Sequence, residues 1–167
     1  RQVYKQWDKH LYKEYLKRFQ LPADKEIKTL SKGMKMKLCI AVALSHKPKL
    51  LILDEATSGL DPVMRDDILD VFLEFVQDAN HSIMMSSHIS TDLEKVADYI
   101  TFIHQGKVVF SKRKDELRYH YGIIRCGAAV FNQIDKKEVL AYRKDDYQWN
   151  VLVAEKEKAK RKYKNAV

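Results

Sequence analysis

An uninterrupted apolar run ends in two acids: Lys49 is followed by Leu50 to Leu53 and then by Asp54 and Glu55. Consecutive apolar residues are typical of a strand that is covered on both faces of a parallel sheet, so we expect a buried strand over residues 49–53. Ligands of open parallel sheets bind outside the carboxyl ends of the strands. The run therefore predicts an α/β fold with two carboxylates at a ligand-binding edge.

These two acids suit a site for a nucleotide and Mg²⁺. Asp54 can hold the ion. The side chain of Glu55 is expected to point in another direction than that of Asp54, and it can orient an attacking water as a general base. A second buried strand is expected over residues 83–85, shortly before His88. A histidine at that edge can contact a phosphate. The alternative is an ordinary strand that meets its loop, with a histidine that is only structural.

Two helices are indicated before the first strand. Apolar spacing predicts a helix over residues 11–19, with Asp8 as its cap and Trp7 packed on Tyr12. Another helix is expected from Ser31 to about residue 46. The alternation of strands and helices indicates a parallel sheet.

The helix starts at Ser31 and at Asp61 carry further candidate residues. A hydroxyl and free N–H groups at a helix N-terminus form a ready anion site, and Gly33 allows a ligand to approach the backbone closely. Asp61 precedes Pro62, which fits a cap followed by proline at the first helical position. The alternative interpretation of Ser31 and Asp61 is that both are ordinary caps.

The last third of the chain changes in character. A hairpin is expected around Gln105-Gly106. From about residue 118 the pattern predicts a small unit with a strand over 122–125, a helix over 128–141 and a strand over 148–153, followed by a basic helix over 155–163. We interpret this part as a separate C-terminal extension.

Composition limits the remaining classes. The 167 residues include 31 Lys and Arg against 23 Asp and Glu, a net charge of +8. This excess fits nucleic acid or an anionic membrane surface, but six of the ten residues from 155 to 164 are Lys or Arg, so a basic tail explains it as well. Neither Cys39 nor Cys126 belongs to a CxxC pair, which argues against a metal site or disulfide framework, and Cys39 is expected in the core.

Four short motifs occur together in one order: LSKGM from Leu30, LLILDE from Leu50, SGLDP from Ser58, and Ser87-His88. As a set they resemble the signature, Walker B strand, D-loop and switch histidine of ABC transporter ATP-binding proteins. The resemblance covers roughly residues 7–117, and the extension resembles those of exporter-type ATPase subunits.

The resemblance implies a role for each candidate residue, with ATP and Mg²⁺ as cofactors. Asp54 would hold Mg²⁺, Glu55 would polarise the hydrolytic water and His88 would contact the γ-phosphate. Ser31 and Gly33 would contact the ATP held by an opposite subunit, and Asp61 would link the two sites. Lys32 stands where the signature usually has glycine, and its added charge would lie near phosphate or face solvent.

The same resemblance implies partners and a location. Two ATPase subunits would close head to tail over ATP and drive a transmembrane permease subunit, at the cytoplasmic face of the cell membrane. No specific nucleic acid is expected. Two alternatives stay open: an ABC-type ATPase that acts on nucleic acid, in DNA repair or translation, and a chain that acts only by association.

One family motif is missing, because the sequence contains no G-x-x-x-x-G-K-[ST]. We therefore expect a part of a longer protein, without Walker A loop or Q-loop, that binds and hydrolyses ATP poorly alone. The expected fold is a partial P-loop NTPase (RecA-like) α/β sheet with part of the ABC helical subdomain and a small α+β extension. The expected domains are residues 1–47 (helical subdomain part), 48–117 (ATPase core part) and 118–167 (extension).

Overall fold

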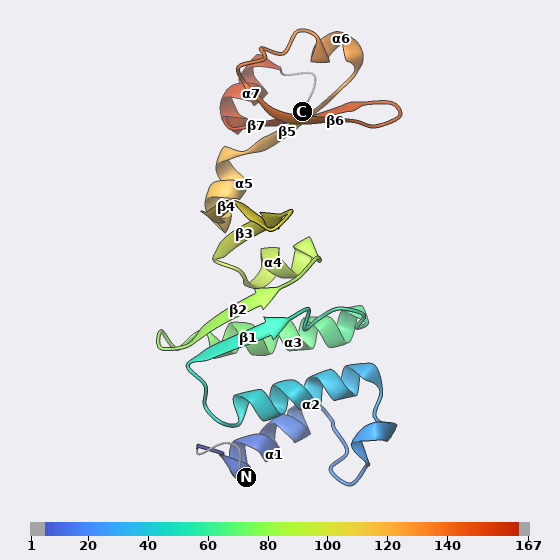
Figure 1. Ribbon diagram of the computed structural model, residues 1–167, viewed down its shortest axis with the longest axis vertical. Coiled ribbons are helices and arrows are strands. Elements are labelled where there is room, and N and C mark those ends of the chain that lie inside the picture. Colours follow the sequence, from blue (N-terminus) through green and yellow to red (C-terminus); the bar gives the residue numbers. More distant parts are fainter. Residues whose placement is uncertain (1–5, 164–167) are drawn as a thin grey trace. The chain divides into compact units, whose positions relative to one another are not determined.

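The computed structural model describes residues 6–163. The chain divides into two compact units, Arg1–Val96 and Ala97–Val167, and each is described by itself (Figure 1). The domain boundaries expected after residues 47 and 117 stay predictions. Residues 1–5 and 164–167, at the ends of the first and last expected domains, lie outside the described residues.

The first unit starts with helices and continues as strands that alternate with helices, as predicted for an α/β fold. Its elements are α1 (Lys9–Arg18), a 3-10 helix η1 (Ile27–Thr29), α2 (Lys32–Leu44), β1 (Leu50–Asp54), α3 (Pro62–Phe75), β2 (Ser82–Ser86) and α4 (Ser90–Val96).

Short-range contacts explain where α1 begins. A carboxylate oxygen of Asp8 accepts hydrogen bonds from the backbone N–H groups of His10, at 2.9 Å, and Leu11, at 3.0 Å. The rings of Trp7 and Tyr12 lie with their centroids 5.0 Å apart. Both contacts satisfy or cover the otherwise unpaired first turn of a helix. The cap and the packed aromatic pair predicted from the sequence are confirmed.

Strands β1 and β2 form a parallel pair joined through α3 (Figure 1). Leu50 lies opposite Ser82, and Asp54 lies opposite Ser86. The prediction that both strands are buried on two faces is wrong. Leu51 is 4% exposed, but Ile52 on the other face of β1 is 72% exposed. The reason is that this sheet has two strands, and the helices of the unit cover one of its faces.

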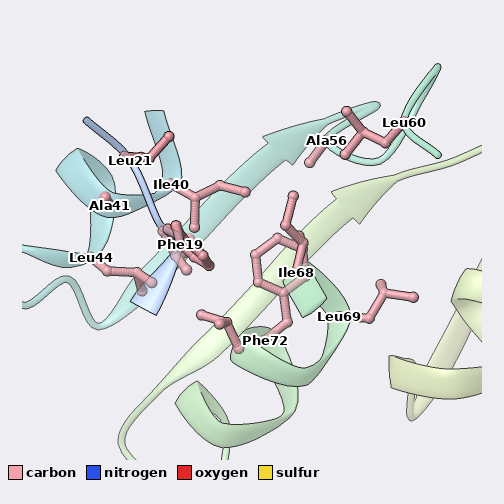
Figure 2. Packing of buried hydrophobic residues seen from close by; sticks show 12 residues of the cluster. Phe19, Leu21, Ile40, Ala41, Leu44, Ala56, Leu60, Ile68, Leu69 and Phe72 are labelled. Atoms are coloured by element: carbon pink, nitrogen blue, oxygen red, sulfur yellow. The ribbon is translucent and has the colours of Figure 1, made fainter. Parts of the chain in front are cut away.

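The core of the first unit gathers on the covered face of β1, where side chains from α2, α3 and the segment that follows α1 meet (Figure 2). Ile68 and Phe72 of α3 and Ala41 of α2 are fully buried. Their burial removes apolar surface from water, which is the main favourable contribution to folding. Cys39 was expected in this core but is exposed, because the helical period places it off the stripe of α2 that carries Ile40, Ala41 and Leu44.

One buried charge ties α2 to α3. Lys37 is 7% exposed as a residue, and its Nζ donates a hydrogen bond to Asp67 Oδ2 at 3.0 Å. The ammonium also lies 5.7 Å from the ring centroid of Phe19. A buried ammonium is tolerated when it is paired and hydrogen-bonded. This contact therefore fixes the two helices that carry Ser31 and Asp61 at their N-termini.

The second unit begins with an antiparallel hairpin, as predicted. Gln105 and Gly106 connect its strands with φ values of +48° and +73°, the left-handed conformations that suit a tight hairpin turn. The elements of this unit are β3 (Tyr99–His104), β4 (Lys107–Arg113), α5 (Lys114–His120), β5 (Gly122–Cys126), α6 (Ala128–Phe131), β6 (Val139–Lys144), β7 (Trp149–Val153) and α7 (Lys156–Lys162).

The helix predicted over residues 128–141 is mostly wrong. Helix α6 stops at Phe131, and Val139–Lys144 form β6, which pairs with β7 in a three-stranded antiparallel sheet of order β5-β7-β6. Asp135 explains the break, since its side chain accepts a hydrogen bond from the backbone N–H of Lys137 at 3.0 Å. Such an Asx turn competes with helical hydrogen bonds. The expected α+β extension is present, with one more strand than predicted.

Helix α7 is held to this small sheet by a charged cluster. Glu138 Oε2 accepts hydrogen bonds from Tyr163 Oη, at 2.9 Å, and from Lys162 Nζ, at 3.1 Å. The Lys162 ammonium and the Tyr163 hydroxyl lower the pKa of the Glu138 carboxyl. The basic helix predicted near the C-terminus is confirmed, and part of its charge serves this contact. Among residues 6–163, no helix combines the length and the apolar character needed to cross a membrane.

Candidate functional site

The carboxyl ends of β1 and β2 bring the acidic pair and the histidine together. Asp54 and Ser86 are the last partners of the parallel ladder, so their side chains share one face of the sheet. The Ser86 hydroxyl donates a hydrogen bond to Asp54 Oδ1 at 2.6 Å. The predicted meeting of these strand ends at one edge is confirmed.

Glu55 leaves the strand in an unusual backbone conformation. Its φ is +50°, in the left-handed region that non-glycine residues adopt at a cost of about 1–3 kcal/mol. Its backbone N–H donates a hydrogen bond to Ser86 Oγ at 3.0 Å. The turn directs the Glu55 side chain to His88, whose Nδ1 lies 2.6 Å from Glu55 Oε2.

The Glu55–His88 pair is open to solvent. The side chain of His88 is 67% exposed and that of Glu55 is 40% exposed. An ionised carboxylate only accepts hydrogen bonds, and a protonated imidazole Nδ1 can donate to it at this distance. The other ring nitrogen is left to meet a ligand. The pair thus offers an oriented carboxylate beside an imidazole at the ligand edge of the sheet.

A second cluster lies at the N-terminus of α2. Ser31 caps this helix, and its Oγ accepts a hydrogen bond from the backbone N–H of Met34 at 3.2 Å. The hydroxyl can still donate, since an oxygen of this kind accepts and donates at once. Asp61 caps α3 in the same way, with its Oδ1 3.0 Å from the backbone N of Met64. Both residues are helix caps, as the simpler interpretation predicted.

Gly33 packs against α3, and Lys32 lies beside the segment that leads into this helix. A Cβ on Gly33 would lie 2.5 Å from Met64 Sδ, so the absence of a side chain lets the two helices approach closely. Lys32 Nζ lies 2.5 Å from the position a Cβ would take on Gly59. Within the described chain, these residues make no hydrogen bond or ion pair with Asp54, Glu55 or His88.

Ser86 is the residue of this edge that sequence reasoning missed. The signal was available in principle, because Asp54 and Ser86 both end apolar runs and parallel strand ends meet at one edge. The strand register that places the hydroxyl between Asp54 and Glu55 is a tertiary feature, and a single sequence does not state it.

The oxygen donors at this edge fit a magnesium ion that is held partly by its substrate. Asp54 offers a carboxylate, and Mg²⁺ commonly binds one or two carboxylates while phosphates and waters complete its shell. In the described part of the chain there is no group of three or more His, Cys, Asp and Glu residues that could hold a metal alone. The arrangement therefore suits a metal that arrives with a nucleotide.

This chain is similar in sequence to proteins of a known family. Residues 2–58 match the family model described as ABC transporter. The chain is 44% identical over 89 residues to the lantibiotic transport ATP-binding protein SrtF of Streptococcus pyogenes, which covers 53% of this chain and 38% of that protein. It is 31% identical over 121 residues to the ABC transporter ATP-binding protein YtrB of Bacillus subtilis, covering 72% of this chain and 41% of YtrB. The chain thus spans about two fifths of these relatives.

Solved structures agree on the fold. The dimeric bacterial ABC transporter cassette MJ0796 is 20% identical, with a TM-score of 0.57 over 62% of this chain and 46% of that one. CbiO1 from Clostridium perfringens, part of the ABC transporter complex cbiONQ, is 29% identical, with a TM-score of 0.55 over 65% of this chain and 44% of that one. The family match over residues 2–58 and the curated relatives show that this chain is similar to ABC transporter ATP-binding proteins, while the likeness to MJ0796 shows the fold alone.

Proposed function

We propose that this chain supplies the Walker B, switch, signature and D-loop parts of an ATP-hydrolysing subunit that drives a membrane transporter. The observation that carries the proposal is the set of contacts at the carboxyl edge of β1 and β2, where Ser86 bonds Asp54 and Glu55 bonds His88. A metal-binding carboxylate, a general base and an imidazole that can face a phosphate, all on one rigid edge, are groups that phosphoryl transfer to water uses.

Each residue takes a separate part in the proposed reaction. Asp54 would hold Mg²⁺, which neutralises charge on the phosphates when it is bound. Glu55 accepts a proton from the attacking water and orients it. His88 keeps its Nδ1 hydrogen bond to Glu55, while its other nitrogen faces the γ-phosphate. Charge stabilisation and positioning account for most of the rate gain in this kind of chemistry.

The α2 cluster would serve the ATP of an opposite subunit. Ser31 has a hydroxyl hydrogen to donate, and Gly33 adds a backbone N–H at the positive end of the helix dipole. The exposed ammonium of Lys32 adds a positive charge beside them. The dimeric state of the MJ0796 cassette supports two such subunits that face each other, and Asp61 would lie where the two sites communicate.

A membrane permease is the proposed partner, with this subunit at the cytoplasmic face. The support comes from relatives named for lantibiotic and bacitracin transport and from CbiO1, which is part of a transporter complex. A role on nucleic acid is not favoured, since these relatives are named for transport. The candidate residues of this chain all have proposed roles at the nucleotide, so they do not specify the cargo.

The proposal is tested by adding the motif that the sequence lacks. The comparison needs this chain alone and a longer protein in which a Walker A segment precedes it, here called the loop-completed protein. Calorimetry with Mg-ATP should give micromolar binding for the loop-completed protein and far weaker binding for the chain alone, because phosphate contacts come mainly from a glycine-rich loop. Hydrolysis should appear only in the former. A loop-completed protein that binds ATP but never hydrolyses it would overturn the proposal.

A further inference from the structure

The Ser86 hydroxyl sits between the two acids of the proposed ATP site. It donates to Asp54 Oδ1 at 2.6 Å and accepts from the backbone N–H of Glu55 at 3.0 Å. One hydroxyl thus satisfies a side chain on β1 and the backbone of the residue that follows the strand. Neither contact is local in sequence, since 32 and 31 positions separate the partners.

The position of this hydroxyl is set by the sheet itself. Ser86 is the last residue of β2 and faces Asp54 across the final step of the parallel ladder. A strand fixes the direction of a side chain more firmly than a loop does. A serine at position 85 would point to the opposite face of the sheet, and Ser87, which lies outside the strand, accepts a hydrogen bond from the backbone N–H of Ile89 instead. The hydroxyl therefore reaches Asp54 and Glu55 only from position 86.

The turn at Glu55 depends on an external partner. A residue with a Cβ at φ +50° is strained, and such strain persists where surrounding contacts hold it. The Ser86 acceptor gives the Glu55 N–H a partner in this conformation. The same turn brings Glu55 Oε2 to 2.6 Å from His88 Nδ1. Loss of the hydroxyl would remove one contact that keeps the carboxylate beside the imidazole.

We infer that Ser86 is a positioning residue for ATP hydrolysis, which holds the Asp54 carboxylate and the left-handed turn of Glu55 in the arrangement that the reaction uses. The inference rests on the proposed function. Ser86 itself takes no proton from water and is not a catalytic residue. Its effect is on the orientation of two groups, and small displacements of such groups cost rate more than binding.

The test is steady-state ATP hydrolysis by the loop-completed protein and its Ser86 variants at saturating Mg²⁺. Ser86→Ala should lower kcat by roughly 10- to 100-fold, as expected for misplaced catalytic groups, with KM for ATP changed less than about 2-fold. Ser86→Thr keeps the hydroxyl and should recover most of kcat. Ser86→Cys keeps the size but bonds weakly through sulfur, so it should resemble Ser86→Ala.

Ser82→Ala is the matched control, because Ser82 lies on the same face of β2 at its other end, opposite Leu50. It should leave kcat and KM unchanged. A Ser86→Ala protein with unaltered kcat, or a Ser86→Thr protein as slow as Ser86→Ala, would overturn the inference. If the loop-completed protein without any substitution does not hydrolyse ATP, the proposed function fails instead, so the two failures are distinguishable. Circular dichroism on each variant separates loss of rate from loss of folded protein, and Ser86→Cys decides the matter if Ser86→Ala unfolds.

Discussion

His88 Nδ1 lies 2.6 Å from Glu55 Oε2, although the two residues are 33 positions apart and follow different strands. The contact exists because β1 and β2 are parallel and end at the same edge. In the loop-completed protein, His88→Ala should lower kcat for ATP by at least about 100-fold, the usual minimum for a group that acts with a general base. His10→Ala is the control, since its side chain is 85% exposed in the helix α1 region. A His88→Ala protein with wild-type kcat would contradict the role given to this pair.

The Lys37–Asp67 contact makes a prediction about stability. Asp67→Ala leaves the Lys37 ammonium buried without its partner, which should cost about 1–3 kcal/mol in the free energy of unfolding. Lys37→Met replaces the ammonium by an apolar chain of similar length and should cost less. Urea denaturation measures both losses of stability, with hydrogen exchange as the readout for the first unit. Equal losses in the two variants would show that the buried charge is not the cause.

Asp8 predicts how stability depends on acid. The backbone N–H of Leu11 and the ammonium of Lys47 lower the pKa of Asp8 to about 2 from an ordinary value of 3.8. Because the folded pKa is below the unfolded one, the contribution to stability is complete above about pH 4 and is lost as the pH falls through about 2. Asp8→Asn should lower Tm at neutral pH, and its difference from wild type should shrink in this acid range. Asp24→Asn in the exposed loop after α1 serves as control, and a pH-independent Asp8→Asn difference would refute the linkage.

Gly59 and Gly106 test the cost of adding a side chain to left-handed backbone. Gly59 has a φ of +69° and Lys32 Nζ nearby, whereas Gly106 has a φ of +73° and nothing within 4 Å. Gly106→Ala should therefore cost about 1–2 kcal/mol from the left-handed backbone alone, and Gly59→Ala should cost about the same, because Lys32 Nζ is the end of a flexible side chain that can move aside. Gly127, with φ −76° and open space around it, should accept alanine almost freely. Hydrogen exchange reports each unit separately, and a Gly127→Ala cost equal to that of Gly59→Ala or Gly106→Ala would contradict this ranking.

Features encoded in a few neighbouring residues were predictable from the sequence. Asp8, Ser31 and Asp61 cap helices as expected, because a cap depends on the next three residues. Motif order placed Asp54, Glu55 and His88 at one edge. The helix expected over 128–141 failed because Asp135 takes a local hydrogen bond and β7 offers a strand partner, a long-range effect.

Burial and the role of Ser86 depended on tertiary structure. The apolar run of β1 predicts cover on both faces, but only Leu51 and its neighbours on that face meet helices, while Ile52 stays exposed. Whether a face is covered depends on which elements pack there, and periodicity does not record that. Ser86 was overlooked for the same reason, because its importance comes from the register with Asp54.

The most direct test of the account is the rate of ATP hydrolysis by the loop-completed protein with Glu55→Gln, beside Glu14→Gln as a control on the exposed face of α1. Glutamine keeps the size of the side chain but cannot accept the proton of the attacking water. We predict that Glu55→Gln binds Mg-ATP as tightly as wild type in calorimetry, while turnover falls by about 100-fold or more, and that Glu14→Gln hydrolyses ATP normally. Hydrolysis by Glu55→Gln at a rate near wild type would show that Glu55 is not the general base and would contradict the central claim.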